Sequence, residues 1–262
     1  MKQDKYFFLI QIEYLGFRYH GWQKQKDVKT VQHMIDRTFS FILGHENFKT
    51  LAASRTDAMV SATDQLFELF IFQDLNADEM KKTLNLNLPA DIRVKHIKKV
   101  DEKFQIINCP KIKEYHYYFS YGEKYHPYCA PFLINFFDEL NIEKMQQAAA
   151  LFEGQHNFKE YCYRAHEGKT FEREILKSTI VENTFLTANF FPKNSFAYIV
   201  KGTGFLHHQI RLMMGTLIKV GKGELELIDI SNSLKGKGSH PMGFIAPSSG
   251  LHLYNNQLIS KD

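Results

Sequence analysis

Segments typical of strands and of helices are interspersed along this chain, without the strict strand–helix–strand repetition that a parallel sheet requires. Residues 6–13 are rich in aromatic and branched side chains, as in a buried strand. From residue 31 to residue 43 apolar side chains recur at helical spacing, with Thr30 as a suitable N-cap and Gly44 as a suitable stop. This mixture favours the α+β class, in which helices pack on a largely antiparallel sheet.

The remaining segments extend this pattern, which starts again near the middle of the chain. In the first part we predict strands over 65–72 and 91–99 and a helix over 77–87 capped by Asn76. In the second part we predict strands over 115–121, 173–183, 195–201 and 251–255, and helices after Asn141, over about 205–220 and near 226–234. We therefore expect two α+β halves, residues 1–105 and 106–262.

The composition is that of a globular protein with a large core. Of the 262 residues, 44% are hydrophobic and 24% are charged. No apolar run approaches the length of a membrane span, and the run at residues 6–10 is too short for a signal segment. The three cysteines form no CxxC pair and no disulfide framework. We therefore expect a reduced, cytoplasmic protein with no membrane partner.

The charge is mildly basic, with a formal net charge of +4. Such a balance permits an RNA partner without requiring one. The basic residues gather in a few stretches, of which the first holds Lys24, Lys26 and Lys29. Runs of this kind are more often solvated surface than a binding groove, and both explanations stay open at this point.

One short segment places an arginine and an aspartate among small residues, directly before a predicted strand. It reads Leu51-Ala52-Ala53-Ser54-Arg55-Thr56-Asp57-Ala58. Small side chains leave room for a ligand near the backbone, and a neighbouring guanidinium favours the ionised carboxylate. Such a carboxylate can act as a nucleophile. On chemistry alone, a surface ion pair or a turn aspartate is the commoner explanation.

This segment resembles the G-R-T-D-A-G-V-H-A signature of the tRNA pseudouridine synthase A (TruA) family. Six further blocks resemble that family in the same order, and together the blocks span residues 14 to 253. They are Tyr14-x-Gly16-x-x-Tyr19-x-Gly21-Trp22-Gln23-x-Gln25 with Thr30-Val31-Gln32, Leu88-Pro89-x-Asp91-Ile92-Arg93-Val94, Lys113-Glu114-Tyr115-x-Tyr117, Gly154-x-His156-Asn157-Phe158, the long block from Gly204 to Gly223, and Ala246-Pro247-x-x-Gly250-Leu251-x-Leu253.

The resemblance implies a pseudouridine synthase fold, in which two RRM-like α+β halves join through a largely antiparallel central sheet around the active cleft. It also implies a homodimer that binds tRNA and uses neither a metal nor an organic cofactor. The implied reaction isomerises uridine to pseudouridine in the anticodon stem-loop, around positions 38 to 40. The target base must leave its stack for this reaction, which costs a few kcal/mol.

The resemblance further assigns roles to individual residues. Asp57 is the expected catalytic carboxylate, which attacks the sugar or the base or removes a sugar proton. Arg55 is expected to steady the phosphate backbone, Tyr115 to stack on the everted uracil, and Arg211 to pair with Asp57. The full set of expected substrate contacts is Arg55, Tyr115, Phe205, Leu206 and Arg211. The expected RNA-binding residues are Arg18, Trp22, Gln23, Lys24, His207 and His208.

The chain departs from the family pattern near these residues. Met59 and Ser61 stand where the family has a glycine and a histidine, and Gln105 and Ile107 stand where it has a histidine and an arginine. Met59 adds a side chain where the backbone would approach RNA or take a positive φ. The loss of an arginine and a histidine would weaken contacts with phosphates.

Three readings of the sequence follow from these matches and departures. The first is a working synthase that acts on the tRNA anticodon stem-loop or, in a diverged form, on a different uridine or a different RNA. The second is a paralogue that binds RNA without turnover. The third, an unrelated hydrolase that uses Asp57, leaves six blocks unexplained. We favour the working enzyme because Arg55, Asp57, Tyr115 and Arg211 are all present.

Overall fold

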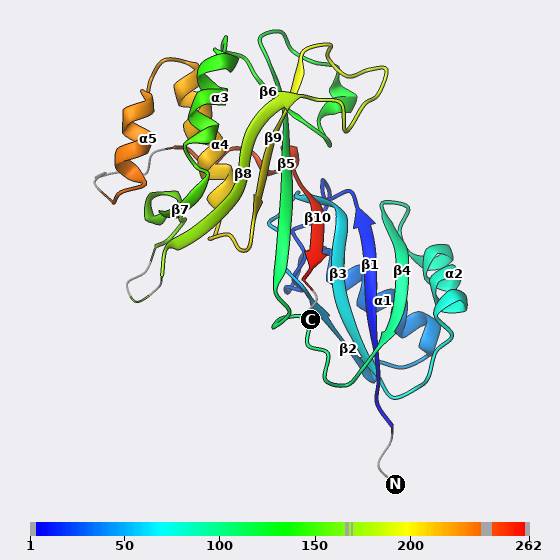
Figure 1. The fold of residues 1–262 in the computed structure, drawn as a ribbon. Coiled ribbons are helices and arrows are strands. Elements are labelled where there is room, and N and C mark those ends of the chain that lie inside the picture. Colours follow the sequence, from blue (N-terminus) through cyan, green and yellow to red (C-terminus); the bar gives the residue numbers. More distant parts are fainter. Residues whose placement is uncertain (1–3, 166–167, 169, 237–242, 260–262) are drawn as a thin grey trace. The chain divides into compact units, whose positions relative to one another are not determined.

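The computed structural model describes residues 4–165, 168, 170–236 and 243–259. Ten strands and five α-helices lie within these ranges, which confirms the α+β class (Figure 1). The chain forms two compact units, Met1–Pro110 with Leu253–Asp262, and Lys111–His252. No helix among the described residues has the length and apolar character that crossing a membrane demands.

The strands of the first unit form a mainly antiparallel sheet in the order β4-β1-β3-β10. β1 (Tyr6–Tyr14) pairs antiparallel with both β3 (Ser61–Ile71) and β4 (Ile92–Val100). β2 (Phe48–Ala52) pairs antiparallel with residues 67–71 of β3, and β10 (Leu251–Leu258) also pairs with β3. β2 escaped prediction because its five residues, Phe-Lys-Thr-Leu-Ala, show no alternation of polar and apolar side chains.

Two helices complete the first unit, and both have the predicted caps. α1 (Val31–Leu43) begins at Thr30, whose hydroxyl accepts a hydrogen bond from the backbone N–H of His33, and ends at Gly44 with a φ of 72°. α2 (Ala77–Asn87) begins at Asn76, whose side chain accepts hydrogen bonds from two backbone N–H groups. In the view of Figure 1, α1 lies behind the strands and α2 lies against β4.

The second unit contains a sheet of order β5-β9-β8-β7, in which these neighbours run antiparallel. Its strands are β5 (Lys111–Tyr121), β6 (Ile134–Phe136), β7 (Gly154–Asn157), β8 (Glu172–Glu182) and β9 (Ser195–Gly202), and β6 pairs parallel with β5. β6 and β7 were not predicted from the sequence. At three and four residues, each is too short to carry a readable alternation of side chains.

Three α-helices belong to the second unit, namely α3 (Ile142–Ala150), α4 (Gln209–Gly221) and α5 (Leu227–Ser233). α4 is central, because all of its residues except Arg211 and Lys219 are buried. It begins at Gln209, later than the predicted residue 205, because His208 has a left-handed φ of 57° and cannot continue a helix.

The two compact units differ from the predicted halves, which meet between residues 105 and 106. The first unit extends to Pro110 and also takes the C-terminal residues from Leu253, which we had expected in the second half. The cause is the pairing of β10 with β3, a contact between segments far apart in the sequence. Patterns within short windows carry no information on such a pairing.

Candidate active site

Asp57 lies on the loop of residues 53–60 that joins β2 to β3, named here the Asp57 loop. The backbone N–H of Ala53 still donates to the carbonyl of Leu66 at 2.9 Å, so the pairing of the hairpin ends where the loop begins. Asp57 is half-buried, whereas its neighbours Arg55 and Ala58 are exposed. The hairpin therefore carries the carboxylate on a short connection between two paired strands.

The N-terminal motif block holds this loop through hydrogen bonds from its backbone and side chains. The backbone N–H of Trp22 donates to the carbonyl of Thr56 at 3.2 Å, and that of Met59 donates to the carbonyl of Tyr19 at 2.9 Å. The hydroxyl groups of Tyr14 and Thr56 are hydrogen-bonded at 2.8 Å. Thr56, directly before Asp57, and Met59, two residues after it, are thus fixed by a segment some forty residues earlier in the chain.

Two glycines of the same block are required because the Asp57 loop packs directly on their backbone. A Cβ atom on Gly16 would lie 2.0 Å from the carbonyl oxygen of Val60, and one on Gly21 would lie 2.5 Å from that of Thr56. Both separations are far below van der Waals contact. Gly21 also has a φ of 84°, which side chains disfavour.

The departures from the family pattern at residues 59 and 61 have visible structural consequences. Met59 has a φ of 66°, as expected for a position where the family has glycine. The backbone N–H of Val60 donates to the carbonyl of Asp57 at 3.2 Å, so residues 57–60 form a tight turn with Met59 at its third position. Ser61 is buried, and its hydroxyl accepts a hydrogen bond from the backbone N–H of Gly16 at 2.9 Å.

In the second unit, two of the expected substrate contacts lie side by side. The ring of Tyr115 on β5 meets the ring of Phe205 edge to face, with centroids 5.3 Å apart. Phe205 belongs to the loop before α4, in which the backbone N–H of Leu206 donates to the side-chain oxygen of Gln209 at 2.8 Å. Tyr115 is buried and Phe205 and Leu206 are half-buried.

Arg211 is held by the loop that carries the last motif block. Its Nε donates to the carbonyl of Ala246 at 2.7 Å, and the backbone N–H of Ala246 donates to the carbonyl of Arg211 at 3.2 Å. The hydroxyl of Tyr117 donates to the carbonyl of Pro247 at 2.8 Å. The loop of Ala246 and Pro247 therefore fixes the direction of the Arg211 side chain and ties it to β5.

Lys113 is a candidate that the sequence did not single out, although it belongs to a matched block. It lies two residues before Tyr115 on β5, so both side chains lie on the same face of the strand. Burial, with a smaller contribution from the charge of Lys111, lowers the pKa of Lys113 below its usual value. A partly buried cation on the face of Tyr115 is suited to binding a polar substrate.

Arg18, one of the expected RNA-binding residues, forms an ion pair with Asp91. Its Nη2 donates to Oδ1 of Asp91 at 2.9 Å, and its Nε donates to Oδ2. The hydroxyl of Tyr19 donates to Oδ1 of Asp91 at 2.6 Å. Burial alone would raise the pKa of Asp91, but the hydrogen bonds from Arg18 and Tyr19 bring it below its ordinary value. Arg18 therefore presents a guanidinium whose charge is already balanced.

The expectation that Trp22 contacts RNA is corrected by its burial. Its side chain is 1% exposed and lies between the rings of Tyr14 and Phe67, at centroid distances of 6.2 and 5.8 Å. A ring enclosed in this way is not available for stacking on a base. Trp22 instead belongs to the core beneath the Asp57 loop, which its backbone N–H also contacts.

Gln23 and Lys24 are both bonded to Gln32 on α1. The side-chain nitrogen of Gln23 and the backbone N–H of Lys24 each donate to Oε1 of Gln32 at 3.0 Å. The ammonium of Lys24 lies 3.8 Å from Oδ2 of Asp36, and its side chain is 56% exposed. Lys24 therefore presents a cation to solvent with only a loose carboxylate partner.

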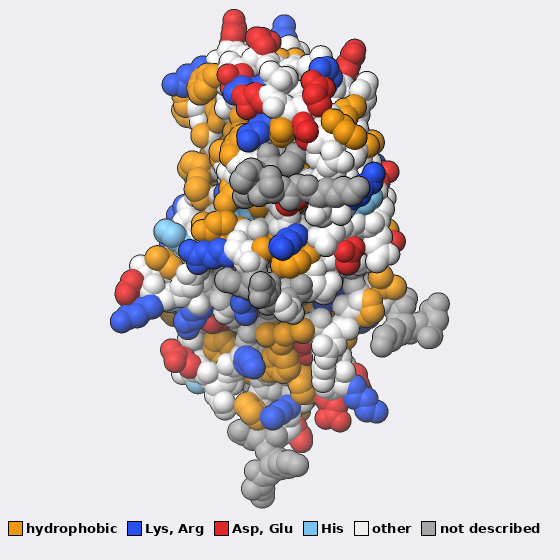
Figure 2. Space-filling model, turned by 90° about the vertical axis from the view of Figure 1, so that its left-hand side faces the viewer, with side chains coloured by type: hydrophobic (Ala, Val, Ile, Leu, Met, Phe, Trp, Pro, Cys, Tyr) orange, Lys and Arg blue, Asp and Glu red, His pale blue; other side chains and the backbone are white. Residues whose placement is uncertain are grey.

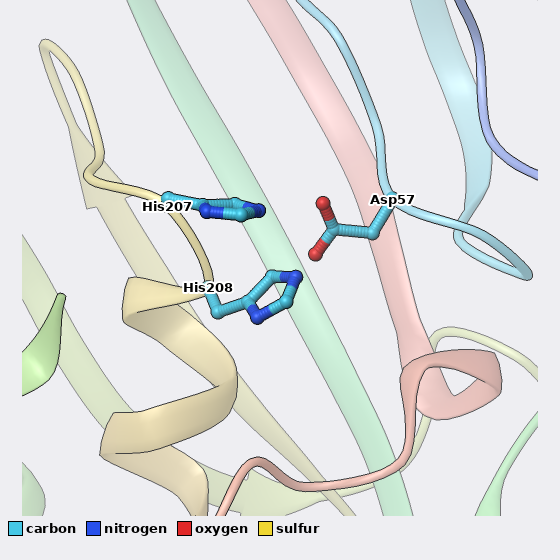
Figure 3. A group of neighbouring side chains, drawn as sticks. All are labelled: Asp57, His207 and His208. Atoms are coloured by element: carbon cyan, nitrogen blue, oxygen red, sulfur yellow. The ribbon is translucent and has the colours of Figure 1, made fainter. Parts of the chain in front are cut away.

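His207 and His208 occupy the turn that leads into α4, as Figure 3 shows together with the Asp57 side chain on its loop. Their ring centroids are 4.0 Å apart, and the ring of Tyr163 stacks on His208 at 4.9 Å. His207 is exposed and His208 is half-buried. The N-terminus of a helix favours phosphate, so this position suits contact with an RNA backbone.

One face of the molecule carries its cations among other side chains. On the face drawn in Figure 2, lysine and arginine side chains are interspersed with hydrophobic and acidic ones. This agrees with the modest net charge of +4. On this face the cations are therefore spread among other side chains and form no broad basic field.

Comparison with known proteins identifies the class to which this fold and this loop belong. A family model described as tRNA pseudouridine synthase matches residues 10–107 and 148–257. These ranges include the Asp57 loop and the turn before α4 but not β5, and they cover most of both units. The protein is therefore an isomerase that acts on uridine in RNA. The chain belongs to the tRNA pseudouridine synthase family, whose members convert uridine to pseudouridine in tRNA, and the predicted pseudouridine synthase fold is confirmed.

Curated relatives agree with this assignment over nearly their full length. The chain is 33% identical to tRNA pseudouridine synthase A of Pseudothermotoga lettingae over 248 residues, which cover 94% of this chain and 97% of the relative. It is 34% identical to tRNA pseudouridine synthase A of Ruminiclostridium cellulolyticum over 248 residues, which cover 93% and 96%. The protein of the same name from a Geobacillus strain is 29% identical over 243 residues, covering 93% and 94%.

Proposed function

We propose that this protein converts uridine to pseudouridine in the anticodon stem-loop of tRNA, around positions 38 to 40, with Asp57 as the catalytic carboxylate. The observation that carries the proposal is the bracing of the Asp57 loop by the N-terminal block, through Tyr14, Tyr19 and Trp22. A catalytic group must be held in a defined geometry, because a small misplacement greatly slows a reaction. The half-burial of Asp57 leaves it accessible to a base that has left its stack.

The reaction rearranges bonds within one nucleotide and needs no second substrate. The bond from the sugar to N1 of uracil breaks, the base turns, and a bond from the sugar to C5 forms, while C5 loses its proton and N1 gains one. In this proposal Asp57 acts on the sugar or the base as nucleophile or as base. Arg211 is its proposed charge partner, which would keep the carboxylate ionised.

The other residues are proposed to hold the substrate. Tyr115 and Phe205 meet edge to face and would form an aromatic wall for the uracil, with Leu206 beside them. Arg55, which is exposed two residues before Asp57, would bind the phosphate backbone next to the everted nucleotide.

Contacts with the rest of the tRNA are assigned to exposed or half-buried polar groups of both units. Arg18, Gln23 and Lys24 would contribute from the first unit, and His207 and His208 from the turn before α4. We further propose that the protein works in the cytoplasm as a homodimer. A mass of about twice 30.7 kDa in light scattering is the expected result for a dimer.

Substitution of Asp57 by asparagine tests the catalytic assignment. Asp57→Asn keeps the size of the side chain and removes its charge, so pseudouridine formation in tRNA should fall by at least about a thousandfold. Binding of tRNA, measured by filter retention, should remain within a few-fold of the unsubstituted protein. The matched control is Asp27→Asn, an exposed aspartate of the same unit that has a left-handed φ and lies in no proposed role. Full activity of Asp57→Asn would refute the assignment.

A different target uridine is the second candidate, and a specific observation favours it. Gln105 and Ile107, which replace a histidine and an arginine of the family pattern, are both exposed, and Ile107 is 60% exposed. A surface with glutamine and isoleucine in place of a histidine and an arginine would contact RNA differently. A map of pseudouridine in total RNA, with and without this protein, decides between the anticodon stem-loop and another site.

A further inference from the structure

Gln65 is a fully buried polar residue on β3, opposite Ile12 of β1, and it belongs to none of the matched blocks. Burial of a carboxamide is unfavourable unless its atoms are hydrogen-bonded. Its Nε2 donates to the carbonyl of Ser54 at 2.8 Å, and its Oε1 accepts from the backbone N–H of Leu66 at 3.2 Å. The hydroxyl of Ser54 also donates to Oε1, at 3.4 Å. Both ends of the buried carboxamide are therefore occupied.

These bonds extend the β2–β3 hairpin beyond its last backbone pair. The hairpin ladder ends at the hydrogen bond from Ala53 to Leu66, and the next residue along the chain is Ser54. The carboxamide of Gln65 holds Ser54 in the way that a strand backbone would hold it. The entrance to the Asp57 loop is thereby fixed three residues before the carboxylate.

Tyr14 of β1 holds the loop on the other side of Arg55. Its hydroxyl is bonded to the hydroxyl of Thr56, the residue directly before Asp57, at 2.8 Å. Tyr14 is 5% exposed and packs against Trp22, so its ring has little freedom to move. The loop is therefore hydrogen-bonded at Ser54 and at Thr56 to side chains from two adjacent strands of one sheet.

We propose that Gln65 and Tyr14 are positioning residues, which set the direction of the Asp57 carboxylate towards the uridine. This inference rests on the proposed catalytic role of Asp57. The two side chains act through the loop and touch no substrate. A shift of about 1 Å in a catalytic group can cost a hundredfold in rate. Loss of the hydrogen bonds from either side chain should therefore slow the chemical step and leave binding of tRNA intact.

The test is a single-turnover measurement with enzyme in excess over a tRNA transcript. The maximal rate then reports the chemical step, and the enzyme concentration at half-maximal rate reports binding. Gln65→Met keeps the length of the side chain without its carboxamide. Its maximal rate should fall by about 10- to 100-fold, while the half-saturating concentration stays within about twofold.

The matched control is a carboxamide that makes the same kind of bond elsewhere in the first unit. Asn85 on α2 donates to the carbonyl of Val94 at 2.9 Å and accepts from the backbone N–H of Val94 at 2.7 Å. Asn85→Leu should lower the melting temperature and leave the maximal rate unchanged. An equal loss of rate in both variants would reduce the role of Gln65 to general stability and overturn the proposal.

A second pair of variants keeps the proposal testable if Gln65→Met does not fold. Tyr14→Phe and Thr56→Val each remove one hydroxyl of the bond, and both are small changes. If the bond positions Asp57, each should lower the maximal rate about tenfold, and the double variant should be no slower than the slower single one. Multiplicative losses, or losses seen only in the half-saturating concentration, would contradict the proposal.

Asp57→Asn separates this inference from the proposed function. If Asp57→Asn is inactive and Gln65→Met has the full maximal rate, the positioning role alone is wrong. If Asp57→Asn remains active, the catalytic assignment fails first and the positioning role fails with it.

Discussion

At the scale of single residues, Met59 is the departure from the family pattern with the clearest physical cost. A side chain at a left-handed φ of 66° crowds the following carbonyl, which costs about 1 to 2 kcal/mol relative to a right-handed conformation. The family's glycine at this place led us to expect either a close approach of RNA to the backbone or a positive φ, and the structure has the positive φ.

Met59→Gly should therefore stabilise the folded protein. We expect the free energy of unfolding in urea to rise by about 0.5 to 1 kcal/mol, since the relief of strain exceeds the greater freedom of glycine in the unfolded chain. Ala58→Gly is the control, because Ala58 precedes Met59 in the same turn and has no left-handed φ. It should destabilise by about 0.5 to 1 kcal/mol. Stabilisation by both substitutions, or by neither, would contradict this account.

Other single residues show where motif matching is insufficient. The N-terminal block correctly marked Trp22 as important, but the same pattern fits a ring on the surface and a ring in the core. The choice depends on Phe67, a residue of a strand that pairs with β1 across a gap of more than fifty residues. Gln65 escaped notice for the same reason, because its role follows from the pairing of β2 with β3.

His252 provides a prediction of pH dependence. It is fully buried, and its Nε2 lies 3.0 Å from the carbonyl of Phe132. Burial lowers the pKa of His252 to about 4, below the ordinary 6.5. The unfolded chain therefore binds a proton on this imidazole more tightly than the folded protein does. Protonation below the ordinary pKa consequently stabilises the unfolded chain and lowers the free energy of unfolding. Stability should therefore be complete above about pH 6.5 and decline as the pH falls from there towards about 4.

The variant His252→Gln should remove this part of the pH dependence. The lowered pKa corresponds to a loss of roughly 3 kcal/mol in the free energy of unfolding between pH 7 and pH 4. Denaturant unfolding at a series of pH values can measure this loss. The exposed His45 supplies the control, and His45→Gln should leave the profile as it is. Identical profiles for the unsubstituted protein and His252→Gln would show that His252 does not carry the effect.

At the scale of elements, the hairpin of β2 and β3 and the N-terminal block form one supporting unit for the Asp57 loop. The long helices and strands could be predicted from periodicity, because each buries one face along its length, as in α1 with its buried Ile35 and Phe39. The short β2 could not, although it delivers the loop. The elements nearest the chemistry are those whose form depends most on contacts with distant segments.

A pair of glycines separates packing on this loop from backbone strain. Gly21 and Gly44 have similar φ values of 84° and 72°. A Cβ on Gly21 would lie 2.5 Å from the carbonyl oxygen of Thr56, whereas one on Gly44 would meet nothing within 4 Å. Gly44→Ala should thus cost about 1 kcal/mol of stability, and Gly21→Ala about 2 to 4 kcal/mol.

Activity gives the second readout for this pair. Gly21→Ala displaces the backbone at Thr56 and should lower the single-turnover rate even where the protein remains folded, because Asp57 is the next residue. Gly44→Ala should leave that rate unchanged, since Gly44 ends α1 away from the loop. Equal effects of the two variants on stability and rate would argue against direct packing of the loop on Gly21.

At the scale of the whole molecule, the sequence predicted the α+β fold class and an organisation in two parts. It did not predict which residues belong to each compact unit. Local patterns favoured α+β units and a repeat of the order after the middle of the chain. They could not reveal that the chain returns to the first unit at Leu253, because β10 pairs with β3, a strand far earlier in the sequence. No pattern within a short window shows that pairing.

The charge of the whole molecule leads to a prediction for tRNA binding. With a net charge of only +4, affinity should depend on individual phosphate contacts, each of which changes the slope of log Kd against log salt by about 0.7 to 0.9. Lys24→Gln should lower the slope by about that amount, because its ammonium is exposed and lies 3.8 Å from Asp36. Arg18→Gln should change the slope much less, since Asp91 already balances the guanidinium through two hydrogen bonds. Filter-binding titrations at four or more salt concentrations measure both slopes. A larger change of slope for Arg18→Gln than for Lys24→Gln would mean that Arg18 leaves Asp91 to bind a phosphate.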